Sequence, residues 1–291
     1  MKFKRIALIG KYQAPGLASQ VILLANHLKG CGCTVSIDCG DYCALDHFAG
    51  FNTGKIKELC PQLDLVIVIG GDGTLLSVAR EIADCDIPVV GVNQGKLGFM
   101  TDIAIDTMLA SLDEIVVEEK YQLELRSMIY AQVVRQNKVV MQKIALNDVV
   151  ISRGAIGNMI EFDLQINNEF VLSQKADGVI FATPTGSTAY SLAAGGAILH
   201  PNACVFSIVP ICPQSLSNRP LVVPDNASIE FILVRENATQ IHVDGQECFD
   251  LIHEDKVVLT KHVKQFKLLH PKGYNYFHTL RNKLDWSKRV S

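Results

Sequence analysis

The sequence predicts an α/β plus all-β protein, with an N-terminal doubly wound parallel α/β domain and a C-terminal β-sandwich-like domain. Residues 1–119 alternate short apolar runs with amphipathic segments, the pattern of a parallel sheet covered by helices. Residues 120–269 carry many short β-rich runs separated by polar turns, which is typical of a sandwich. A length of 291 residues suits two domains of ordinary size.

The first domain is expected to contain four strands and three helices. The run at 64–70 is continuously apolar and β-branched, as in a strand covered on both faces. The segment at 15–29 has apolar residues at helical spacing and stops at Gly30. In chain order we expect a strand at 5–10, a helix at 15–29, strands at 34–38 and 64–70, a helix at 74–83, a strand at 87–92 and a helix at 105–116.

The second domain is expected to be built from short strands. The turn pairs Gln136-Asn137 and Asn167-Asn168 suit tight hairpins, because Asn tolerates positive φ. The small-residue segment 188–199 interrupts this pattern and is expected to be helical at its start, and 277–286 is expected to form a last helix. Strands are expected at 123–134, 138–146, 148–153, 159–166, 169–174, 178–183, 204–209, 228–234, 240–243 and 256–260.

Composition excludes several functional classes. With 27 basic and 30 acidic side chains, the net charge of -3 argues against a polybasic nucleic-acid binder and against a membrane-surface protein. The apolar run after the basic N-terminus ends at Gly10-Lys11, and no run reaches the roughly 18 residues of a membrane span. The nine cysteines are expected to be reduced thiols in a soluble cytoplasmic protein.

The charge is unevenly distributed along the chain. Residues 1–119 carry a net charge of -6, residues 120–269 carry -1, and residues 270–291 carry +4. We therefore predict that the basic C-terminal segment packs on the acidic N-terminal domain. The domains would then be 1–119 plus 270–291, with the glycine-rich segment at 70–74, and 120–269, the β-rich domain.

The most informative motif is Gly70-Gly71-Asp72-Gly73-Thr74, between a buried strand and a helix. Open α/β sheets bind ligands at the carboxyl ends of their strands, and glycines let backbone N–H groups approach phosphate oxygens. A carboxylate in such a loop repels phosphate unless it holds a metal or takes a proton, and both roles suit phosphoryl transfer. The alternative is an ordinary turn in which Asp72 caps the helix. Leu76 replaces the third glycine of a Rossmann fingerprint, and the segment 91–96 is one residue short of a P-loop.

The GGDGT motif resembles that of NAD kinases, diacylglycerol kinases and sphingosine kinases. Four further stretches resemble NAD kinases alone, and the resemblance extends over almost the whole chain. They are GVNQGKLGF (91–99), LNDVV (146–150), DGVIFATPTGSTAYSLAAGG (177–196) and Arg219-Pro220-Leu221. The chain is therefore identified by resemblance as a member of the NAD kinase family.

The resemblance implies an enzyme that uses ATP and Mg²⁺, or another divalent cation, to phosphorylate the 2′-hydroxyl of the adenosine ribose of NAD. Asp72 matches the general base, in a phosphate loop that includes Gly70, Gly71 and Thr74. The implied partners are NAD and ATP, without nucleic acid or membrane, and the family suggests a homodimer or homotetramer. The substrate-binding positions implied by the resemblance are Gly73, Phe99, Asn147, Asp148, Asn158, Lys175, Asp177, Thr188, Ala189, Tyr190, Ser191 and Gln246.

Several of these positions depart from the family pattern or have structural alternatives. Asp148 stands where the family usually has glutamate, and Lys175 where it often has arginine. Asn158 and Gln214 stand where relatives often carry histidine. The alternatives are an Asx turn at 147–148, a capped turn at 183–188, an exposed strand lysine at 175, core packing at Phe99 and a hairpin turn on Asp244-Gly245.

Two other functions and one metal site remain open from the residues alone. A lipid kinase would share GGDGT, but it would leave the matches at Asn147 and at 177–196 unexplained. A protein that only senses a nucleotide would bind it better without Asp72, because that carboxylate repels phosphate. Zinc binding is one interpretation of the cluster Cys31, Cys33, Cys39 and Cys43, although its spacing differs from the usual paired knuckles. The alternative for that cluster is a set of small buried side chains.

Overall fold

The computed structural model describes residues 2–10, 16–38, 40, 48–154, 158–235 and 238–286. They divide into two units, Met1–Glu124 with Phe266–Ser291, and Leu125–Gln265. The first unit therefore ends at residue 124 and resumes at 266, whereas the predicted domain ends at 119 and resumes at 270. The difference arises because the expected strand at 123–134 is two strands, β7 (Tyr121–Arg126) and β8 (Ile129–Arg135), and β7 belongs to the sheet of the first unit.

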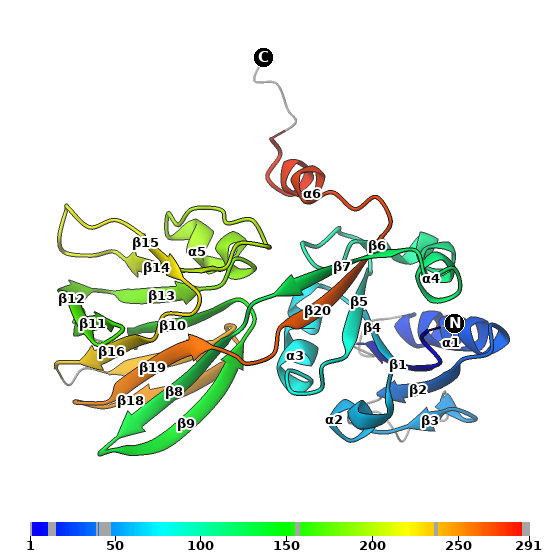
Figure 1. The fold of residues 1–291 in the computed structure, drawn as a ribbon, viewed down its shortest axis with the longest axis horizontal. Coiled ribbons are helices and arrows are strands. Elements are labelled where there is room, and N and C mark those ends of the chain that lie inside the picture. Colours follow the sequence, from blue (N-terminus) through cyan, green and yellow to red (C-terminus); the bar gives the residue numbers. More distant parts are fainter. Residues whose placement is uncertain are drawn as a thin grey trace. The chain divides into compact units, whose positions relative to one another are not determined.

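The first unit is built on an eight-stranded sheet with the order β3-β2-β1-β4-β5-β20-β7, in which β6 also pairs with β5 (Figure 1). The pairs among β1 to β6, and the pair of β5 with β20, are parallel. From β1, the chain first adds β2 and β3 on one side of the sheet and then adds β4 and β5 on the other side, so the strand order reverses between β1 and β4. The strands are β1 (Arg5–Gly10), β2 (Thr34–Asp38), β3 (Asn52–Thr53), β4 (Leu65–Ile69), β5 (Pro88–Asn93), β6 (Ile103–Ala104), β7 and β20 (Phe266–Pro271).

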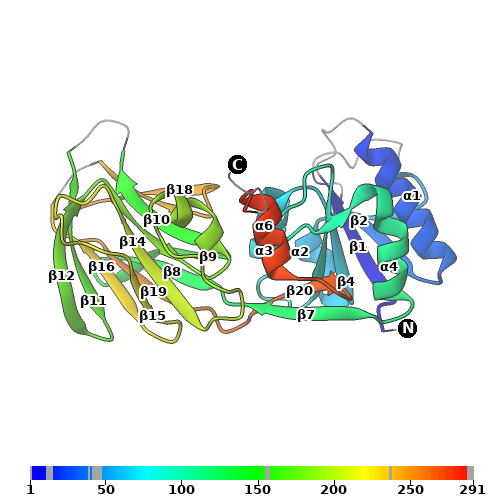
Figure 2. The same ribbon diagram turned by 90° about the horizontal axis from the view of Figure 1, so that it is seen from above.

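Helices cover both faces of this sheet (Figure 2). The apolar sides of α1 (Leu17–Gly30) and α4 (Met108–Val116) pack in one cluster with alternate residues of β1 and β4, such as Ile6 and Ile67. The helix α3 (Asp72–Glu81) contacts α2 (Ile56–Leu59), and neither belongs to that cluster. The predicted helix at 105–116 begins as a short 3-10 turn, η4 (Ile105–Thr107).

The C-terminal segment belongs to the first unit. Its strand β20 lies between β5 and β7, and Leu268 and Leu269 are buried in the sheet. Ion pairs also join the segment to this unit, such as Lys267 Nζ with Asp86 Oδ1 at 2.8 Å and His270 with Asp102 and Glu124. Strand pairing and apolar burial therefore hold the segment, with charge as an addition. The last helix is α6 (Tyr276–Lys283), close to the expected 277–286.

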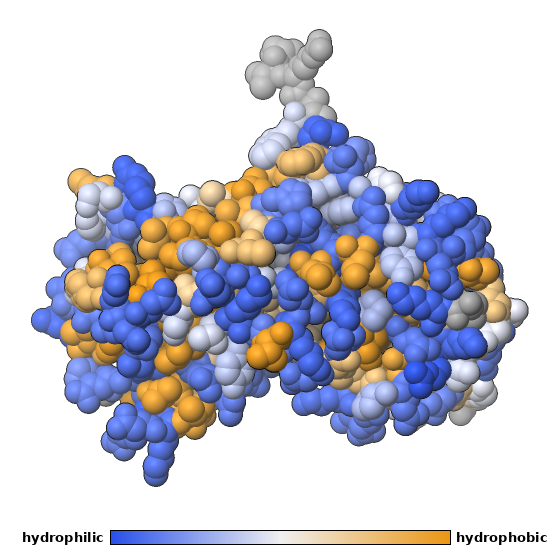
Figure 3. Space-filling view, viewed as in Figure 1, coloured by the Kyte–Doolittle hydropathy of each residue, from blue (hydrophilic) through white to orange (hydrophobic). Residues whose placement is uncertain are grey.

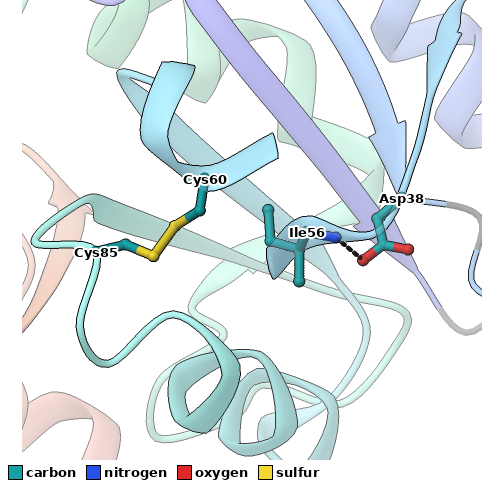
Figure 4. Close-up of a disulfide and its surroundings, with 4 residues drawn as sticks. All are labelled: Asp38, Ile56, Cys60 and Cys85. Atoms are coloured by element: carbon teal, nitrogen blue, oxygen red, sulfur yellow. Dashed lines mark hydrogen bonds between the residues drawn. A yellow bond between two sulfur atoms is a disulfide. The ribbon is translucent and has the colours of Figure 1, made fainter. Parts of the chain in front are cut away.

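One cysteine pair departs from the expectation of reduced thiols. Cys60 in the 3-10 turn η3 (Cys60–Gln62), which follows α2, forms a disulfide with Cys85, in the segment between α3 and β5 (Figure 4). On the same side of the unit, Ile56 N–H donates to Asp38 Oδ2 at 2.9 Å. The two sulfur atoms meet because α2 and α3 pack against each other, a proximity that their sequence separation of 25 residues does not reveal.

The second unit consists of two six-stranded sheets whose pairs are antiparallel, with the orders β15-β14-β13-β10-β17-β18 and β12-β11-β16-β19-β8-β9. Both sheets contribute to one apolar core, in which Phe162 and Phe231 stack with ring centroids 4.8 Å apart. The strands are β8, β9 (Lys138–Ala145), β10 (Asp148–Arg153), β11 (Ile160–Ile166), β12 (Glu169–Ala176), β13 (Gly178–Ala182), β14 (Val205–Ile211), β15 (Leu221–Pro224), β16 (Ile229–Leu233), β17 (Thr239–Val243), β18 (Glu247–Leu251) and β19 (Lys256–Lys261). The expected sandwich is confirmed.

The expected Asn-containing hairpins are also confirmed. Gln136 and Asn137 have φ values of 49° and 61°, and Asn167 and Asn168 have φ values of 52° and 66°. Each pair is the two-residue loop of a hairpin, since the flanking residues pair directly across it.

The outer face of the sheet with β10, β13 and β14 is covered by the segment expected to interrupt the sandwich. It contains the 3-10 turn η5 (Gly186–Thr188) and the short helix α5 (Tyr190–Ala193). Ala194, which follows α5, packs on Val150, Ile180 and Val209. Apolar side chains gather around α5 on the face shown in Figure 3. Among the described residues, no helix combines the length and the apolar character needed to cross a bilayer.

Candidate active site

The GGDGT loop lies where the strand order of the first unit reverses. Gly70 and Gly71 follow β4, and α3 begins at Asp72, so the loop is at the carboxyl end of a strand next to β1. A doubly wound sheet forms its binding crevice at this topological switch point. The residue that precedes α3 as its N-cap is Gly71, so the alternative in which Asp72 caps the helix is wrong.

The Asp72 carboxylate is held by a second loop of the same unit. Its Oδ2 accepts a hydrogen bond from Phe99 N–H at 2.8 Å. Its Oδ1 accepts bonds from Met100 N–H at 3.1 Å and from the backbone and hydroxyl of Thr101, both at 3.2 Å. These donors fix the orientation of the carboxylate.

Gly98 allows this approach of the two loops. A Cβ at this position would lie 2.2 Å from Asp72 Oδ1 and 2.2 Å from Thr101 Oγ1, so a larger residue would displace the carboxylate. The two oxygens of Asp72 therefore differ in how many further hydrogen bonds they can accept. A carboxylate offers about four lone-pair sites, and Oδ1 has three donors while Oδ2 has one. Oδ2 is therefore the oxygen with room for another proton or ligand.

Phe99 lies beside this loop and is half-buried. The Nζ atom of Lys283, from α6, is 5.7 Å from the centroid of the Phe99 ring, within the range of a cation–π contact. The ring is thus covered in part by the C-terminal helix of the same unit.

Asn147 and Asp148 lie at one end of β10 in the second unit, on a backbone fixed by Asp244. The Oδ1 atom of Asp244 accepts from Asn147 N–H at 2.8 Å and from Asp148 N–H at 3.2 Å, and its Oδ2 accepts from Leu146 N–H at 3.1 Å. From the other side, Thr183 N–H donates to Asn147 O at 2.9 Å. This support comes from the 244 turn and from 183, so a local Asx turn is not what holds the pair.

Asp148 is 5% exposed and shares a face of β10 with Val150, on the side that the α5 segment covers. Burial in this position, together with the negative charge of Asp244, raises the pKa of Asp148 to about 7. The side chain therefore exchanges its proton near neutral pH, where an ordinary aspartate is fully ionised.

The segment after β13 approaches Asn147 closely. A Cβ on Gly186 would lie 2.1 Å from Asn147 O, so only glycine fits there. Ser187 Oγ donates to Pro184 O and accepts from Leu199 N–H, and Thr188 Oγ1 donates to Thr185 O. These bonds fix the turn, but no side chain caps η5 or α5, so the alternative of a turn that caps a helix is wrong. After the turn, Ala189 is half-buried, Tyr190 is 49% exposed, and Ser191 is buried with its Oγ unpaired in the structure.

Gln246 belongs to the hairpin turn between β17 and β18. Asp244 and Gly245 have φ values of 50° and 63°, and Gln246 N–H donates to Val243 O at 3.1 Å. The hairpin is therefore real, and it places the exposed Gln246 two residues after Asp244, at the strand end that carries Asn147.

Three predicted residues lie at the opposite strand end of the same unit. Asp177 precedes β13 and Thr183 follows it, so five strand residues, about 17 Å, separate the two groups. Asp177 Oδ1 accepts from Arg153 Nε at 2.9 Å. Lys175 pairs with Glu161 at 3.4 Å, and Asn158 is exposed before β11. Lys175 is thus an exposed strand lysine, as the alternative expected, and it also forms an ion pair.

Lys175 also lines a cavity of about 570 Å³ in the second unit. Gln214 N–H donates to Lys175 O at 2.9 Å and brings the loop before β15 to this cavity. Most of the residues that line the cavity are polar, and they include both signs of charge; they are Glu161, Leu172, Ser173, Gln174, Lys175, Gln214, Ser215, Ser217, Asn218 and Arg219.

Sequence reasoning missed the residues that hold the site residues in place. Gly98 and Thr101 position Asp72, and Asp244 and Gly186 position Asn147. The separations between the hydrogen-bonded partners, 29 residues for Thr101 and 97 for Asp244, leave no local signal. The positive-φ turn Asp244-Gly245 was the one visible hint, and it indicated only a hairpin.

Comparison with known proteins agrees with this geometry. The model of the ATP-NAD kinase N-terminal domain matches residues 41–121, and that of the C-terminal domain matches residues 146–271. An NAD kinase from Chromobacterium violaceum is 48% identical over 288 residues, 99% of this chain and 98% of that protein. An NAD kinase from Aromatoleum aromaticum is 47% identical, over 98% of this chain and 95% of that protein.

Among solved structures, yeast NADH kinase complexed with NADH has the same fold. It matches with a TM-score of 0.90 at 23% identity, over 100% of this chain and 90% of that one. The family models cover more than half of the sequence and the relatives match it from end to end, so this chain belongs to the NAD kinase family.

Proposed function

We propose that this chain transfers the γ-phosphoryl group of ATP to the 2′-hydroxyl of the adenosine ribose of NAD, giving NADP, with Asp72 as the general base. Membership of the NAD kinase family supports the reaction. The observation that carries the role of Asp72 is its fixed carboxylate, with one further acceptor site on Oδ2, on a glycine loop at the switch point of the sheet.

In this mechanism, Asp72 Oδ2 accepts the proton of the 2′-hydroxyl while the ribose oxygen bonds to the γ-phosphorus and ADP leaves. A ribose hydroxyl is a very weak acid, so the base acts as the new bond forms, and its positioning is worth roughly 10²–10⁴-fold. The four donors on the carboxylate hold it in one orientation, so little reorganisation is needed at the moment of transfer. The N-terminus of α3 adds positive potential for phosphate oxygens near Gly73 and Thr74.

For NAD itself, we propose contacts from both predicted groups of the second unit. Asn147 and Asp148 would bind the ribose and adenine, with Thr188, Ala189, Tyr190, Ser191 and Gln246 at the same strand end. Phe99 would supply an apolar contact, and Asn158, Lys175 and Asp177 would bind a more distant part of the dinucleotide. The rigid backbone at Asn147 supports this proposal, because a fixed amide orients a ribose hydroxyl at small entropic cost.

We also propose a divalent cation, Mg²⁺ or one of similar chemistry, bound with ATP. Mg²⁺ usually binds through substrate phosphates, waters and one or two carboxylates. Asp72 is the carboxylate of the phosphate loop, and its Oδ1 already accepts three hydrogen bonds. Phosphate oxygens would therefore be the main ligands, and the cation would neutralise phosphate charge.

The test is an assay of NADP formation by the purified protein with Mg-ATP and NAD, comparing the wild type with Asp72→Asn. We expect a fall in turnover of about 10²-fold or more for the variant, with NAD binding retained. Asn places an amide donor opposite Phe99 N–H, so a small loss of thermal stability is also expected. The matched control is Asp106→Asn, at an exposed position of η4, which should leave the rate unchanged.

The same assay separates the other functions. A folded wild-type protein that binds NAD but forms no NADP would support a nucleotide sensor, and phosphorylation of a lipid alcohol alone would support a lipid kinase. A near wild-type rate in Asp72→Asn would remove Asp72 from the base role. Inorganic polyphosphate in place of ATP tests the donor. A cytoplasmic location and a homodimer or homotetramer stay predictions, the second to be measured by light scattering.

A further inference from the structure

Three potential metal ligands from two helices meet in the first unit, outside the site described above. His27 and Cys31 lie one turn apart at the carboxyl end of α1, and Asp113 lies in the last turn of α4, beside α1 (Figure 2). His27 Nε2 is 2.7 Å from Asp113 Oδ1. Cys31 Sγ is 3.9 Å from His27 Nε2 and 3.9 Å from Asp113 Oδ1.

These separations let one ion reach all three atoms after a small rotation of the side chains. Zn²⁺ binds nitrogen and oxygen at about 2.0–2.1 Å and sulfur at about 2.3 Å. Two ligands of one ion lie no farther apart than the sum of their bonds, about 4.1 Å for nitrogen with oxygen and about 4.4 Å for sulfur with either. All three separations fall within these limits, and neither helix has to move. The side chains of His27 and Asp113 must rotate so that their 2.7 Å separation widens to the roughly 3.3 Å of a tetrahedral angle.

The surroundings also favour a cation. The free carbonyls of a helix C-terminus carry partial negative charge, and the ends of both α1 and α4 are at the cluster. All three residues are partly exposed, which gives an ion access from solvent and leaves its fourth position to water. Imidazole, thiolate and carboxylate together form a ligand set that suits zinc better than the oxygen-seeking Mg²⁺.

The cluster differs from the cysteine cluster that the sequence suggests. Cys33 is 6% exposed, and its Sγ donates to Phe3 O at 3.7 Å, so it is a buried thiol bonded elsewhere. Cys39 and Cys43 lie outside the described residues. Of that sequence cluster, Cys31 is the member that the structure brings together with a histidine and a carboxylate.

The position is also remote from Asp72 within this unit. Helices that connect parallel strands run opposite to them, so α1 ends at the edge of the sheet where the strands begin. Asp72 lies at the edge where the strands end. We propose that His27 Nε2, Cys31 Sγ and Asp113 Oδ1 bind Zn²⁺ and tie α1 to α4. On binding, the proton between His27 and Asp113 moves to His27 Nδ1, and the Cys31 thiol proton is released to solvent.

The test uses Co²⁺ as a spectroscopic probe of the metal-free, full-length protein. We expect a thiolate-to-cobalt charge-transfer band in the near ultraviolet, intense visible bands of a tetrahedral site, saturation at one ion per chain, and loss of all bands on addition of Zn²⁺. Cys31→Ser should remove the charge-transfer band, and His27→Gln and Asp113→Asn should weaken binding tenfold or more.

Two controls make the assignment specific. Cys204→Ser alters an exposed thiol of the second unit, and Cys39→Ser/Cys43→Ser removes two other cysteines of the sequence cluster; both should keep the band. Zn²⁺ should raise the melting temperature of the wild type but not of Cys31→Ser, while NADP formation is the same in both. Absence of the band at one equivalent of Co²⁺, or its persistence in Cys31→Ser, would overturn the proposal.

Discussion

Two carboxylates, Asp148 and Asp244, share one strand end in the second unit, and their proximity has a measurable consequence. The pKa of Asp148 is raised to about 7 by burial and by Asp244. In the unfolded chain the same group ionises near pH 4. Between these values the folded state binds more protons than the unfolded state, so stability falls as pH rises from about 4 to 7 and is lowest above 7.

The variant Asp148→Asn removes this titration. Relative to the wild type, we expect it to gain stability as pH rises through this window, by at most about 4 kcal/mol at pH 8 compared with pH 4. Urea unfolding at both pH values measures the difference. Asp163→Asn, at a half-buried strand position of β11, is the matched control and should show no comparable gain. A constant difference between Asp148→Asn and wild type at all pH values would contradict the raised pKa.

Gly98 offers a second test at the residue scale. In Gly98→Ala the new Cβ would overlap Asp72 Oδ1 and Thr101 Oγ1, so the carboxylate must shift. We expect kcat to fall by about tenfold or more, with little change in KM for NAD, because the altered group acts in the transition state. Gly30→Ala, where an added Cβ meets nothing within 4 Å, should leave kcat unchanged. An unaltered kcat in Gly98→Ala would mean that the position of Asp72 is not critical.

At the scale of elements, a buried histidine joins β20 to its neighbours. His270 is 1% exposed, and its Nδ1 and Nε2 lie 3.0 Å from Asp102 Oδ2 and 2.9 Å from Glu124 Oε2. Its ring also stacks on Tyr274 with a centroid distance of 3.7 Å. Burial lowers the pKa of His270, but hydrogen bonds and charge from the two carboxylates outweigh it, so the pKa is raised above its ordinary 6.5.

The raised pKa fixes the sign of the pH dependence. The folded state holds the imidazolium proton above the pH at which the unfolded chain releases it. The stabilisation is therefore complete below about pH 6.5 and is lost as pH rises through the higher folded pKa. Asp148 titrates in both the wild type and a His270 variant, so its contribution cancels when the two are compared at the same pH.

We expect His270→Gln to lose about 3–5 kcal/mol of unfolding free energy at pH 6, because it leaves two buried carboxylates without their cation. The loss should shrink at alkaline pH, where the wild-type histidine is neutral. Unfolding by urea at pH 6 and pH 9, with His278→Gln on the exposed side of α6 as control, measures both values. An equal loss at the two pH values would indicate packing alone.

The disulfide links the η3 turn after α2 to the segment after α3, on the sheet face opposite α1. It closes a loop of 25 residues, so we expect its reduction to lower the unfolding free energy by about 2–4 kcal/mol. Thermal unfolding with and without dithiothreitol tests this. Cys60→Ser is expected to have the melting temperature of the reduced wild type, and dithiothreitol should not change it. If reductant leaves the wild-type melting temperature unchanged, the bond does not contribute to stability in solution.

At the scale of the whole molecule, patterns within the sequence predicted much of the architecture. Alternating strands and helices predicted the parallel sheet, and the Asn turns predicted two hairpins that are present. The run at 123–134 misled, because periodicity does not show that a strand passes from one sheet to another. It is divided between β7 and β8, which belong to different sheets.

The candidate site was predictable only as separate motifs. The GGDGT loop lies where a strand-loop-helix pattern places it. The sequence could not show that the 98–101 turn holds Asp72, or that Asp177 and Thr183 are at opposite ends of β13, because both depend on register and on distant contacts. The pairing of Cys60 with Cys85 was likewise hidden by helix packing.

The position of β20 in the sheet bears on how the protein is made. A ribosome completes residues 125–265 before Phe266 leaves the exit tunnel, and those residues form a unit that is continuous in sequence. Until then, the nascent first unit lacks the strand between β5 and β7, and residues 88–90 of β5, which pair with β20, present an unpaired edge to other chains. The part of the chain that is synthesised first is therefore the part that finishes folding last.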